Sequence, residues 1–232
     1  MAANVEQIIG IDERDINSGR IMEMTTVRTV SPEMLITVPN NYRAELIVDG
    51  EHVKTVKQCM KKKLVRIIGS DKDGKSISAL YVSNRKFTSM SWGIGSLVIK
   101  YDFLDGSSVN VGASGTLIAE VSDPIAFYGS FGKSSGTLDL TECTGKITSA
   151  FRVCASKLLV EMFVEAIQPI FETEFMVSEL DRRVNERLCN RPLDDVLPGI
   201  VFRSATVSGI RVNEEDKNAI IDRFGTKRPA RR

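Results

Sequence analysis

Residues 87–127 decide the fold: Phe87-Thr-Ser-Met-Ser-Trp92-Gly93-Ile-Gly95, then Ile99-Lys-Tyr101-Asp102, Gly112, Gly115, and Val121-Ser-Asp123-Pro124-Ile125-Ala126-Phe127. Residues 96–103 and 109–121 are rich in apolar and β-branched side chains, and Asp105-Gly106 between them is typical of a turn. The pattern predicts two sequential antiparallel strands. After them, Asp123 is a predicted N-cap with Pro124 in the first helical position, so residues 125–131 are predicted to form a short helix.

This order of parts resembles the SPFH superfamily (stomatin, prohibitin, flotillin), in particular its soluble bacterial branch labelled "virion core protein-like". In that branch a Trp-Gly-x-Gly turn is followed by an Asp-containing strand, a strand ending in Gly, a strand running into Asp-Pro or Asp-Ser, and a Phe-bearing helix. Residues 42–50 look like the opening hairpin of the family, and residues 199–216 look like its closing strand and helix. The resemblance therefore covers roughly residues 40 to 224.

The resemblance implies a non-enzymatic scaffold that self-associates, often at a membrane surface and sometimes with a protease or another protein client. Family members usually assemble through a long coiled coil, and this chain has no sustained heptads. We therefore expect a smaller homo-oligomer, formed through domain edges or through the helix predicted at residues 146–172. The branch label also implies an alternative function, a structural subunit of a virus-like or phage-like particle.

Composition narrows the class of protein. With 42% hydrophobic and 26% charged residues, the chain of 232 residues is typical of a globular protein. Its formal net charge of +1 gives no strong overall attraction to nucleic acid, so nucleic-acid binding is not expected. The four cysteines stand singly and His52 is the sole histidine, so we expect no metal site and no cofactor. No signal peptide or long apolar run is evident, which predicts a cytoplasmic protein, with peripheral contact to the inner face of the plasma membrane as a further possibility.

The predicted fold class is α+β: a mostly antiparallel N-terminal sheet followed by helices and a late strand. Residues 1–40 form an extension with the first strands, residues 41–224 an SPFH-like domain (sheet-rich 41–123, helix-rich 124–224), and residues 225–232 a basic disordered tail. Strands are predicted at residues 44–48 and 53–56 around an Asp49-Gly50 hairpin, and at residues 63–68 and 78–82. Residues 133–145, rich in Gly, Ser and Thr, are predicted to be a flexible connector.

Residues 146–172 are the longest helical candidate, with apolar residues at three- and four-residue spacing. Its apolar arc is wider than one stripe, which leaves two interpretations: a central core helix, or a helix with one face on the sheet and another on a neighbouring subunit. The candidate interface residues are Phe151, Leu158, Leu159, Met162 and Phe163. Lys157 and Glu161 can pair along this helix. Further on, Ser178 is predicted to cap a helix at 179–189, residues 200–212 to form a strand, and Asn213 to open a final helix that ends at Arg223.

A second motif bears on nucleotide binding. Gly69-Ser-Asp-Lys-Asp-Gly74-Lys75-Ser76 matches the P-loop pattern letter for letter and follows an apolar run at residues 64–68. A P-loop must open a helix, whereas residues 77–82 alternate like a strand, and Asp71 and Asp73 would place negative charge in the phosphate cradle. We therefore interpret the segment as a hairpin turn and keep a nucleotide-binding enzyme through residues 69–76 as a weaker alternative.

Two basic runs are candidates for contact with an anionic surface such as lipid headgroups. Their residues are Lys61, Lys62, Lys63, Lys227, Arg228, Arg231 and Arg232. The interpretation of such runs as merely solvated also stays open. His52 lies beside the Asp49-Gly50 turn and is interpreted as a surface histidine, and Trp92 as a packing anchor. We predict no catalytic residue.

Overall fold

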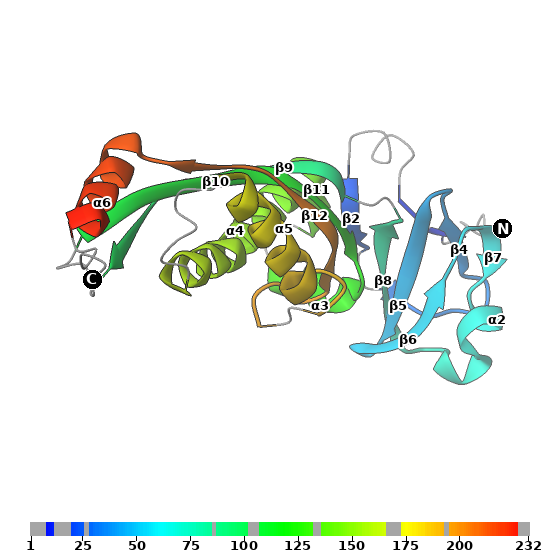
Figure 1. Ribbon diagram of the computed structural model, residues 1–232. Helices are drawn as coiled ribbons and strands as arrows, with labels where there is room; N and C mark the ends of the chain where they lie inside the picture. The colour runs from blue at the N-terminus through cyan, green and yellow to red at the C-terminus, as the bar shows by residue number, and fades with distance from the viewer. Residues whose placement is uncertain are drawn as a thin grey trace. The chain divides into compact units, whose positions relative to one another are not determined.

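The computed structural model describes residues 8–11, 20–25, 28–84, 87–101, 107–131, 136–165, 173–192 and 195–226. The fold class is α+β, as predicted. Its strands are β1 (Ile8–Ile9), β2 (Arg20–Met24), β3 (Arg28–Thr29), β4 (Leu35–Val38), β5 (Tyr42–Val48), β6 (Glu51–Val56), β7 (Cys59–Lys63), β8 (Ser76–Ser83), β9 (Phe87–Tyr101), β10 (Ser107–Val121), β11 (Thr137–Asp139) and β12 (Ile200–Val212). Its helices are α2 (Val65–Ile68), the 3-10 helix η1 (Ser70–Lys72), α3 (Pro124–Phe131), α4 (Leu140–Glu165), α5 (Thr173–Leu188) and α6 (Glu214–Thr226), and Figure 1 labels most of these elements.

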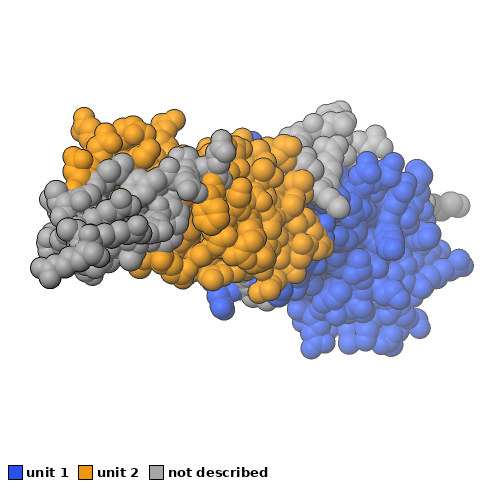
Figure 2. All heavy atoms as spheres, in the orientation of Figure 1, with its two compact units in different colours: residues 1–86, 120–145, 192–200 blue, residues 87–119, 146–191, 201–232 orange. Residues whose placement is uncertain are grey.

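The chain divides into two compact units, coloured separately in Figure 2. Unit 1 comprises residues 1–86, 120–145 and 192–200, and unit 2 comprises residues 87–119, 146–191 and 201–232. The segment predicted as one SPFH-like domain, residues 41–224, is thus shared between the two units.

Unit 1 contains a sheet whose strands have the order β11-β2-β8-β5-β6. The predicted hairpin is confirmed: β5 and β6 pair antiparallel across Asp49 and Gly50, whose φ angles are +52° and +86°. Positive φ at both central residues is what a type I′ turn requires, and Asp-Gly adopts it readily. Strand β8 lies between β2 and β5 and is buried along nearly its whole length, as expected for a central strand.

A smaller sheet, β1-β4-β7, also belongs to unit 1. The strand predicted at residues 63–68 is wrong, because β7 ends at Lys63 and residues 65–68 form the short helix α2. The amides of Ile67 and Ile68 bond to the carbonyl of Leu64 instead of to a neighbouring strand. Burial of Leu64 and Ile68 in the core cluster of this unit favours the helical turn over the β propensity of the isoleucines.

The core of unit 1 is mostly aliphatic, with Tyr81 of β8 fully buried in it. The Tyr81 hydroxyl lies 3.0 Å from the carbonyl oxygen of Ile9 and 3.1 Å from that of Thr37, so it always has an acceptor. Burial raises the pKa of this phenol well above its ordinary value. The group is therefore a neutral hydrogen-bond donor that ties three strands together.

Unit 2 is built on the sheet β12-β10-β9, on which α4 and α5 lie (Figure 1). Trp92 is a packing anchor, as predicted: its ring is 5.1 Å from that of Phe151 on α4, edge to face, and Phe151 makes the same contact with Phe202 on β12. A Cβ added to Gly115 on β10 would lie 1.9 Å from the Thr206 carbonyl oxygen and 2.9 Å from the Trp92 ring. Glycine is therefore the only residue that fits where β10 approaches its neighbour β12 so closely.

The predicted turn at Trp-Gly-x-Gly is wrong, because these residues lie inside the continuous strand β9. Trp92, Gly93 and Ile94 pair with Gly115, Ser114 and Ala113 of β10. Beyond them, two residues of β9, 95 and 96, stand opposite one residue of β10, 112. The glycine at position 95 thus accommodates a β-bulge and not a reversal of the chain.

The helix boundaries follow local capping chemistry. Asp123 accepts hydrogen bonds from the amides of Ile125 and Ala126, which confirms it as the N-cap of α3. Asn213 likewise caps α6 through the Asp216 amide, although α6 runs three residues beyond the predicted end, to Thr226.

Two predicted helix starts are wrong. Helix α4 begins at Leu140, inside the predicted connector, because Asp139 accepts a hydrogen bond of 2.7 Å from the Glu142 amide and so caps it early. Helix α5 begins at Thr173, so Ser178 is an interior residue and not a cap. Residues 166–172, the last part of the helix predicted at 146–172, lie outside the described residues.

Candidate interaction surfaces

The five apolar residues predicted as an oligomer interface lie in the core of the chain. The exposed fraction is 5% for Leu158, 2% for Met162 and 0% for the other three, Phe151, Leu159 and Phe163. Of the two interpretations of this helix, the core helix describes these five side chains, and they are not accessible to a second copy. The physical reason is that α4 is covered on two sides, by the sheet of unit 2 and by α5.

Other residues of α4 form its accessible surface. Val153 and Val164 are 55% and 50% exposed, and Val160 between them is partly buried. Lys157 is exposed beside these valines, whereas Arg152 lies on the other flank of the helix, toward the hollow along the sheet. This outer face combines apolar and charged side chains, and the sequence pattern missed it because the whole helix is rich in apolar residues.

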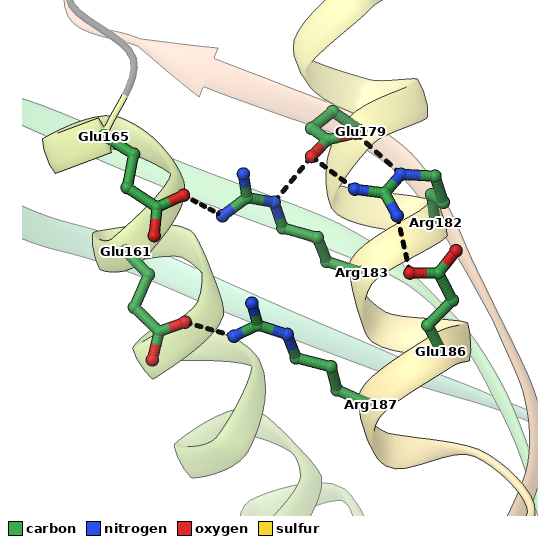
Figure 3. A network of polar contacts seen from close by, with 7 residues as sticks. All are labelled: Glu161, Glu165, Glu179, Arg182, Arg183, Glu186 and Arg187. Carbon is green, nitrogen blue, oxygen red and sulfur yellow. Dashed lines mark hydrogen bonds and ion pairs between the residues drawn. The ribbon is translucent and has the colours of Figure 1, made fainter.

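A network of ion pairs joins α4 to α5 (Figure 3). Arg183 and Arg187 of α5 reach Glu165 and Glu161 of α4, at 2.8 and 2.5 Å. The predicted pair of Lys157 with Glu161 is not what the structure shows, because Arg187 takes Glu161, and Lys157 has no acidic partner among the described residues.

Glu179 lies at the centre of this network and contacts two arginines. It accepts hydrogen bonds from both Nη2 and Nε of Arg182, at 2.8 and 2.9 Å, and from Nε of Arg183 at 2.6 Å. The hydrogen bonds from Arg182 and then Arg183 lower the pKa of Glu179 to about 2. Its carboxylate therefore stays ionised at any ordinary pH and holds the arginines in place.

The opposite side of α5 holds the outer edge of β12. Asn185 donates to the carbonyl of Ala205 and accepts from its amide, at 2.8 and 3.2 Å, as a neighbouring strand would. Asp181 accepts from the Val207 amide at 2.8 Å. These polar side chains satisfy backbone groups that an unprotected edge strand would offer to another chain.

The predicted anionic-contact lysines are on β7, at one edge of its sheet. Lys61, Lys62 and Lys63 are all exposed, and Met60 beside them is 81% exposed. Lys63 is paired with Glu33 at 3.0 Å, and Lys61 has a contact of its own, whereas Lys62 has no acidic partner among the described residues. The basic residues of the tail, 227–232, lie outside the described residues.

The P-loop-like segment has no helix after it. Residues 70–72 form η1, the chain turns at Gly74 with φ +78°, and β8 starts at Ser76. The strand predicted after the motif is confirmed, but the hairpin is wrong, because β8 pairs with β2, β3 and β5 and not with β7. Lys72 forms an ion pair with Asp71 at 2.8 Å, so an acidic side chain occupies the loop. The geometry lacks the helix N-terminus that binds phosphate in a P-loop.

A buried carboxylate in unit 1 was not foreseen. Glu45 on β5 is 4% exposed and accepts hydrogen bonds from Arg43 at 3.1 Å and Thr55 at 2.5 Å, with His52 Nε2 at 3.0 Å. His52 is half-exposed, so it lies at the surface as predicted, with its ring turned to Glu45. All of these polar groups are used within the sheet, where they keep the buried charge compensated.

The four cysteines are free and buried. Burial raises the pKa of Cys189 to about 11 and also raises the pKa of Cys154. A thiol with a raised pKa holds little thiolate near neutral pH, so these two cysteines are poor nucleophiles.

A hollow of about 590 Å³ opens in unit 2 along the strands β9, β10 and β12. Among its lining residues are four glycines and two arginines: Gly93, Gly95, Gly112, Gly209, Arg152 and Arg211. The two guanidinium groups are the charged groups of this lining, so an anionic group would be favoured there.

Among the helices that the structure describes, none has the length and apolar content needed to cross a bilayer. A scan against models of known protein families finds no match to this chain. A search among curated proteins finds no match either.

Proposed function

We propose that this protein is a non-enzymatic, self-associating scaffold of the SPFH type that contacts a membrane surface peripherally. In this proposal it acts in the cytoplasm, at the inner face of the plasma membrane, and holds a protein client there. The observation that carries the proposal is that apolar side chains stay exposed beside charged ones on two elements, β7 and the outer face of α4. Protein interfaces have apolar side chains at the centre and polar side chains at the rim, and apolar side chains next to cations suit a membrane interface.

The arrangement of elements supports the SPFH part of the proposal. Strands β9 and β10 pair antiparallel, and α3 follows with Asp123 and Pro124 at its start. That is the order of strands and helix that the resemblance implies, although the Trp-Gly-x-Gly segment is extended and does not turn.

The β7 surface supports the membrane part. Met60 exposes most of its flexible side chain, and exposed lysines follow it. A lysine near an anionic membrane contributes roughly 1 kcal/mol, and an apolar side chain among lysines can enter the headgroup region. The contact would therefore depend on salt and on anionic lipid.

Light scattering and vesicle flotation test the proposal together. The native mass is measured with and without vesicles of phosphatidylcholine and phosphatidylserine, at low and high salt. We expect an assembly larger than one chain, and flotation with the anionic vesicles that is lost in high salt. A protein that is monomeric at every concentration and does not float with vesicles would overturn the proposal. Co-purification in a defined particle would favour the particle-subunit alternative.

Paired variants sharpen the membrane test. Met60→Ser with Lys62→Glu should reduce flotation several-fold, because both the apolar and the cationic contacts are lost. Lys100→Glu on β9 makes the change of one exposed lysine elsewhere and serves as the control. Equal flotation of the two variants would contradict the role of β7.

A further inference from the structure

We propose that the hollow of unit 2 along β9, β10 and β12 binds a small molecule with a phosphomonoester group, which Arg152 of α4 and Arg211 of β12 hold. This binding site goes beyond the proposed scaffold function and does not depend on it. Three observations support it: the size of the hollow, its charge, and the glycines along its strands.

The hollow is large enough for such a molecule. Its volume of about 590 Å³ lies within the range of roughly 300–1,000 Å³ that is typical of small-molecule sites. A second hollow of about 520 Å³ adjoins it, since Gly95, Gly112 and Arg211 line both. Every lining residue belongs to unit 2, so the site is formed within one unit. A ligand in the first hollow therefore has room to extend along the strands into the second.

The positive charge of the first hollow has no compensating acid. Arg152 donates a hydrogen bond to the neutral hydroxyl of Ser149, and the Arg211 side chain has no hydrogen bond or ion pair among the described residues. Both arginines are exposed to solvent. The described lining of this hollow contains no aspartate or glutamate. Two guanidinium groups are therefore available to one bound anion.

Two arginines favour a phosphomonoester over a carboxylate. Near neutral pH a phosphomonoester carries a charge of about −1.5 to −2, whereas a carboxylate carries a single negative charge. A guanidinium group also matches the geometry of phosphate oxygens through two parallel N–H groups. The hydroxyl of Ser114 lines the same hollow, is exposed and has no hydrogen-bond partner among the described residues, so it can donate to a phosphate oxygen.

An acidic side chain at the far end sets the orientation of the ligand. Glu214 lines only the second hollow and lies 3.7 Å from Lys217. Its carboxylate would repel a phosphate placed beside it. We therefore expect the phosphate in the first hollow and the uncharged part of the ligand toward the second.

Two glycines along the hollow are not required by the fold itself. A Cβ added at Gly209 would meet no other atom within 4 Å, and one added at Gly93 would make an ordinary contact of 3.7 Å with the Ala113 carbonyl oxygen. Neither glycine has a positive φ. Glycine weakens the interior of a strand, and one reason for its presence there is the close approach of a ligand. The missing side chains leave the backbone of β9 and β12 open to such an approach.

Isothermal titration calorimetry with phenyl phosphate tests the site. The unsubstituted protein should bind one molecule per chain, and should bind the singly charged phenyl sulfate several-fold more weakly. Arg152→Gln and Arg211→Gln should each weaken binding of phenyl phosphate about ten-fold, because a hydrogen bond between two charged groups is lost. Arg203→Gln removes an exposed arginine of β12 that does not line the hollow, so this control should leave the affinity nearly unchanged.

Three results would count against the site. If phenyl phosphate does not bind, or if Arg203→Gln weakens binding as much as the two test variants do, the site is overturned. If phenyl sulfate binds as tightly as phenyl phosphate, the assignment to a phosphomonoester is overturned. Circular dichroism checks that each variant is folded, which we expect because neither Arg152 nor Arg211 has an acidic partner among the described residues.

Two further probes distinguish the sources of the phosphomonoester. Glycerol phosphate represents a soluble phosphorylated molecule, and vesicles of phosphatidylcholine with phosphatidic acid represent a lipid headgroup. Binding of glycerol phosphate in calorimetry would assign a soluble ligand. Flotation with the phosphatidic acid vesicles that is lost in Arg152→Gln and Arg211→Gln would assign a lipid.

The β7 variant separates this site from the proposed function. Met60→Ser with Lys62→Glu should bind phenyl phosphate as the unsubstituted chain does, because neither residue lines the hollow. Loss of phenyl phosphate binding in this variant would overturn the location of the site. Absence of phenyl phosphate binding in a chain that still self-associates and floats with anionic vesicles would overturn the site alone.

Discussion

Glu45 in unit 1 and Glu179 in unit 2 are both carboxylates bound by arginine, in very different surroundings. Glu45 is enclosed in a sheet, with its side chain 5% exposed, whereas the Glu179 side chain is 19% exposed and its partner Arg182 is 54% exposed. A charge that loses its partner inside a protein is strongly destabilising, while an exposed pair contributes little. The comparison shows that the distance between two charged groups does not by itself determine how much their interaction contributes to stability.

The largest effect is expected at the buried carboxylate. Glu45→Ala should lower the free energy of unfolding by about 3 kcal/mol, because Arg43 and Thr55 lose their shared acceptor. Chemical unfolding followed by circular dichroism measures it. Glu51→Ala, at an exposed position of β6, is the control and should change stability by less than about 0.5 kcal/mol. Equal effects at the two positions would break the comparison.

An intermediate effect is expected where α5 holds β12. Asn185→Ala should lower stability by about 1–3 kcal/mol, because it leaves the amide and carbonyl of Ala205 without these partners. The higher helix propensity of alanine offsets a few tenths of a kcal/mol at most. The fluorescence of Trp92, the single tryptophan, reports unfolding of unit 2. A variant more stable than the unsubstituted protein would show that the Asn185 hydrogen bonds to β12 do not contribute to stability.

The pH dependence of stability tests Glu179. Its pKa is lowered from 4.5 to about 2 in the folded protein, so its contribution is complete above about pH 4.5 and is lost as pH falls toward 2. Glu179→Gln should lower Tm by a few degrees at pH 7 and make Tm less dependent on pH in that window. Parallel Tm profiles of the two proteins would contradict the coupling to Arg182 and Arg183.

The smallest effect is expected at the edge of the same network. Glu186 is 57% exposed, and its partner among the described residues is Arg182, which Glu179 already binds. Glu186→Gln should therefore shift Tm by less than about 1 °C in differential scanning calorimetry. A shift as large as that of Glu179→Gln would mean that the network acts as one cooperative unit.

Local chemistry explains which parts of the fold could be predicted. Asp49-Gly50, Asp123-Pro124 and Asn213 act on neighbouring backbone, and each produced the predicted turn or helix start. The helix at residues 65–68 was missed because burial outweighed β propensity there. The early start of α4 was missed because the Asp139 cap lies within a Gly/Ser/Thr-rich segment, and such a composition is typical of a loop.

The Glu45 cluster was hidden by a change of register. A regular two-residue hairpin at Asp49-Gly50 would place Lys54 opposite Glu45. In the structure Val53 is an extra residue in β6, so Thr55 stands opposite Glu45 instead. The position of such a bulge cannot be predicted from the residue types of a single sequence. The ion pairs between α4 and α5 were missed for a related reason, since they depend on how two helices pack and not on spacing within either.

The close approach of β10 to its sheet neighbour β12 at Gly115 has a consequence for the sequences of homologues. No side chain can occupy a point 1.9 Å from a neighbouring carbonyl oxygen. Any homologue that keeps this sheet should therefore keep glycine at this position while residues around it diverge. A glycine aligned with Gly115, together with an aromatic residue aligned with Phe151 on the later helix α4, would then be a marker for distant relatives that overall similarity no longer reveals.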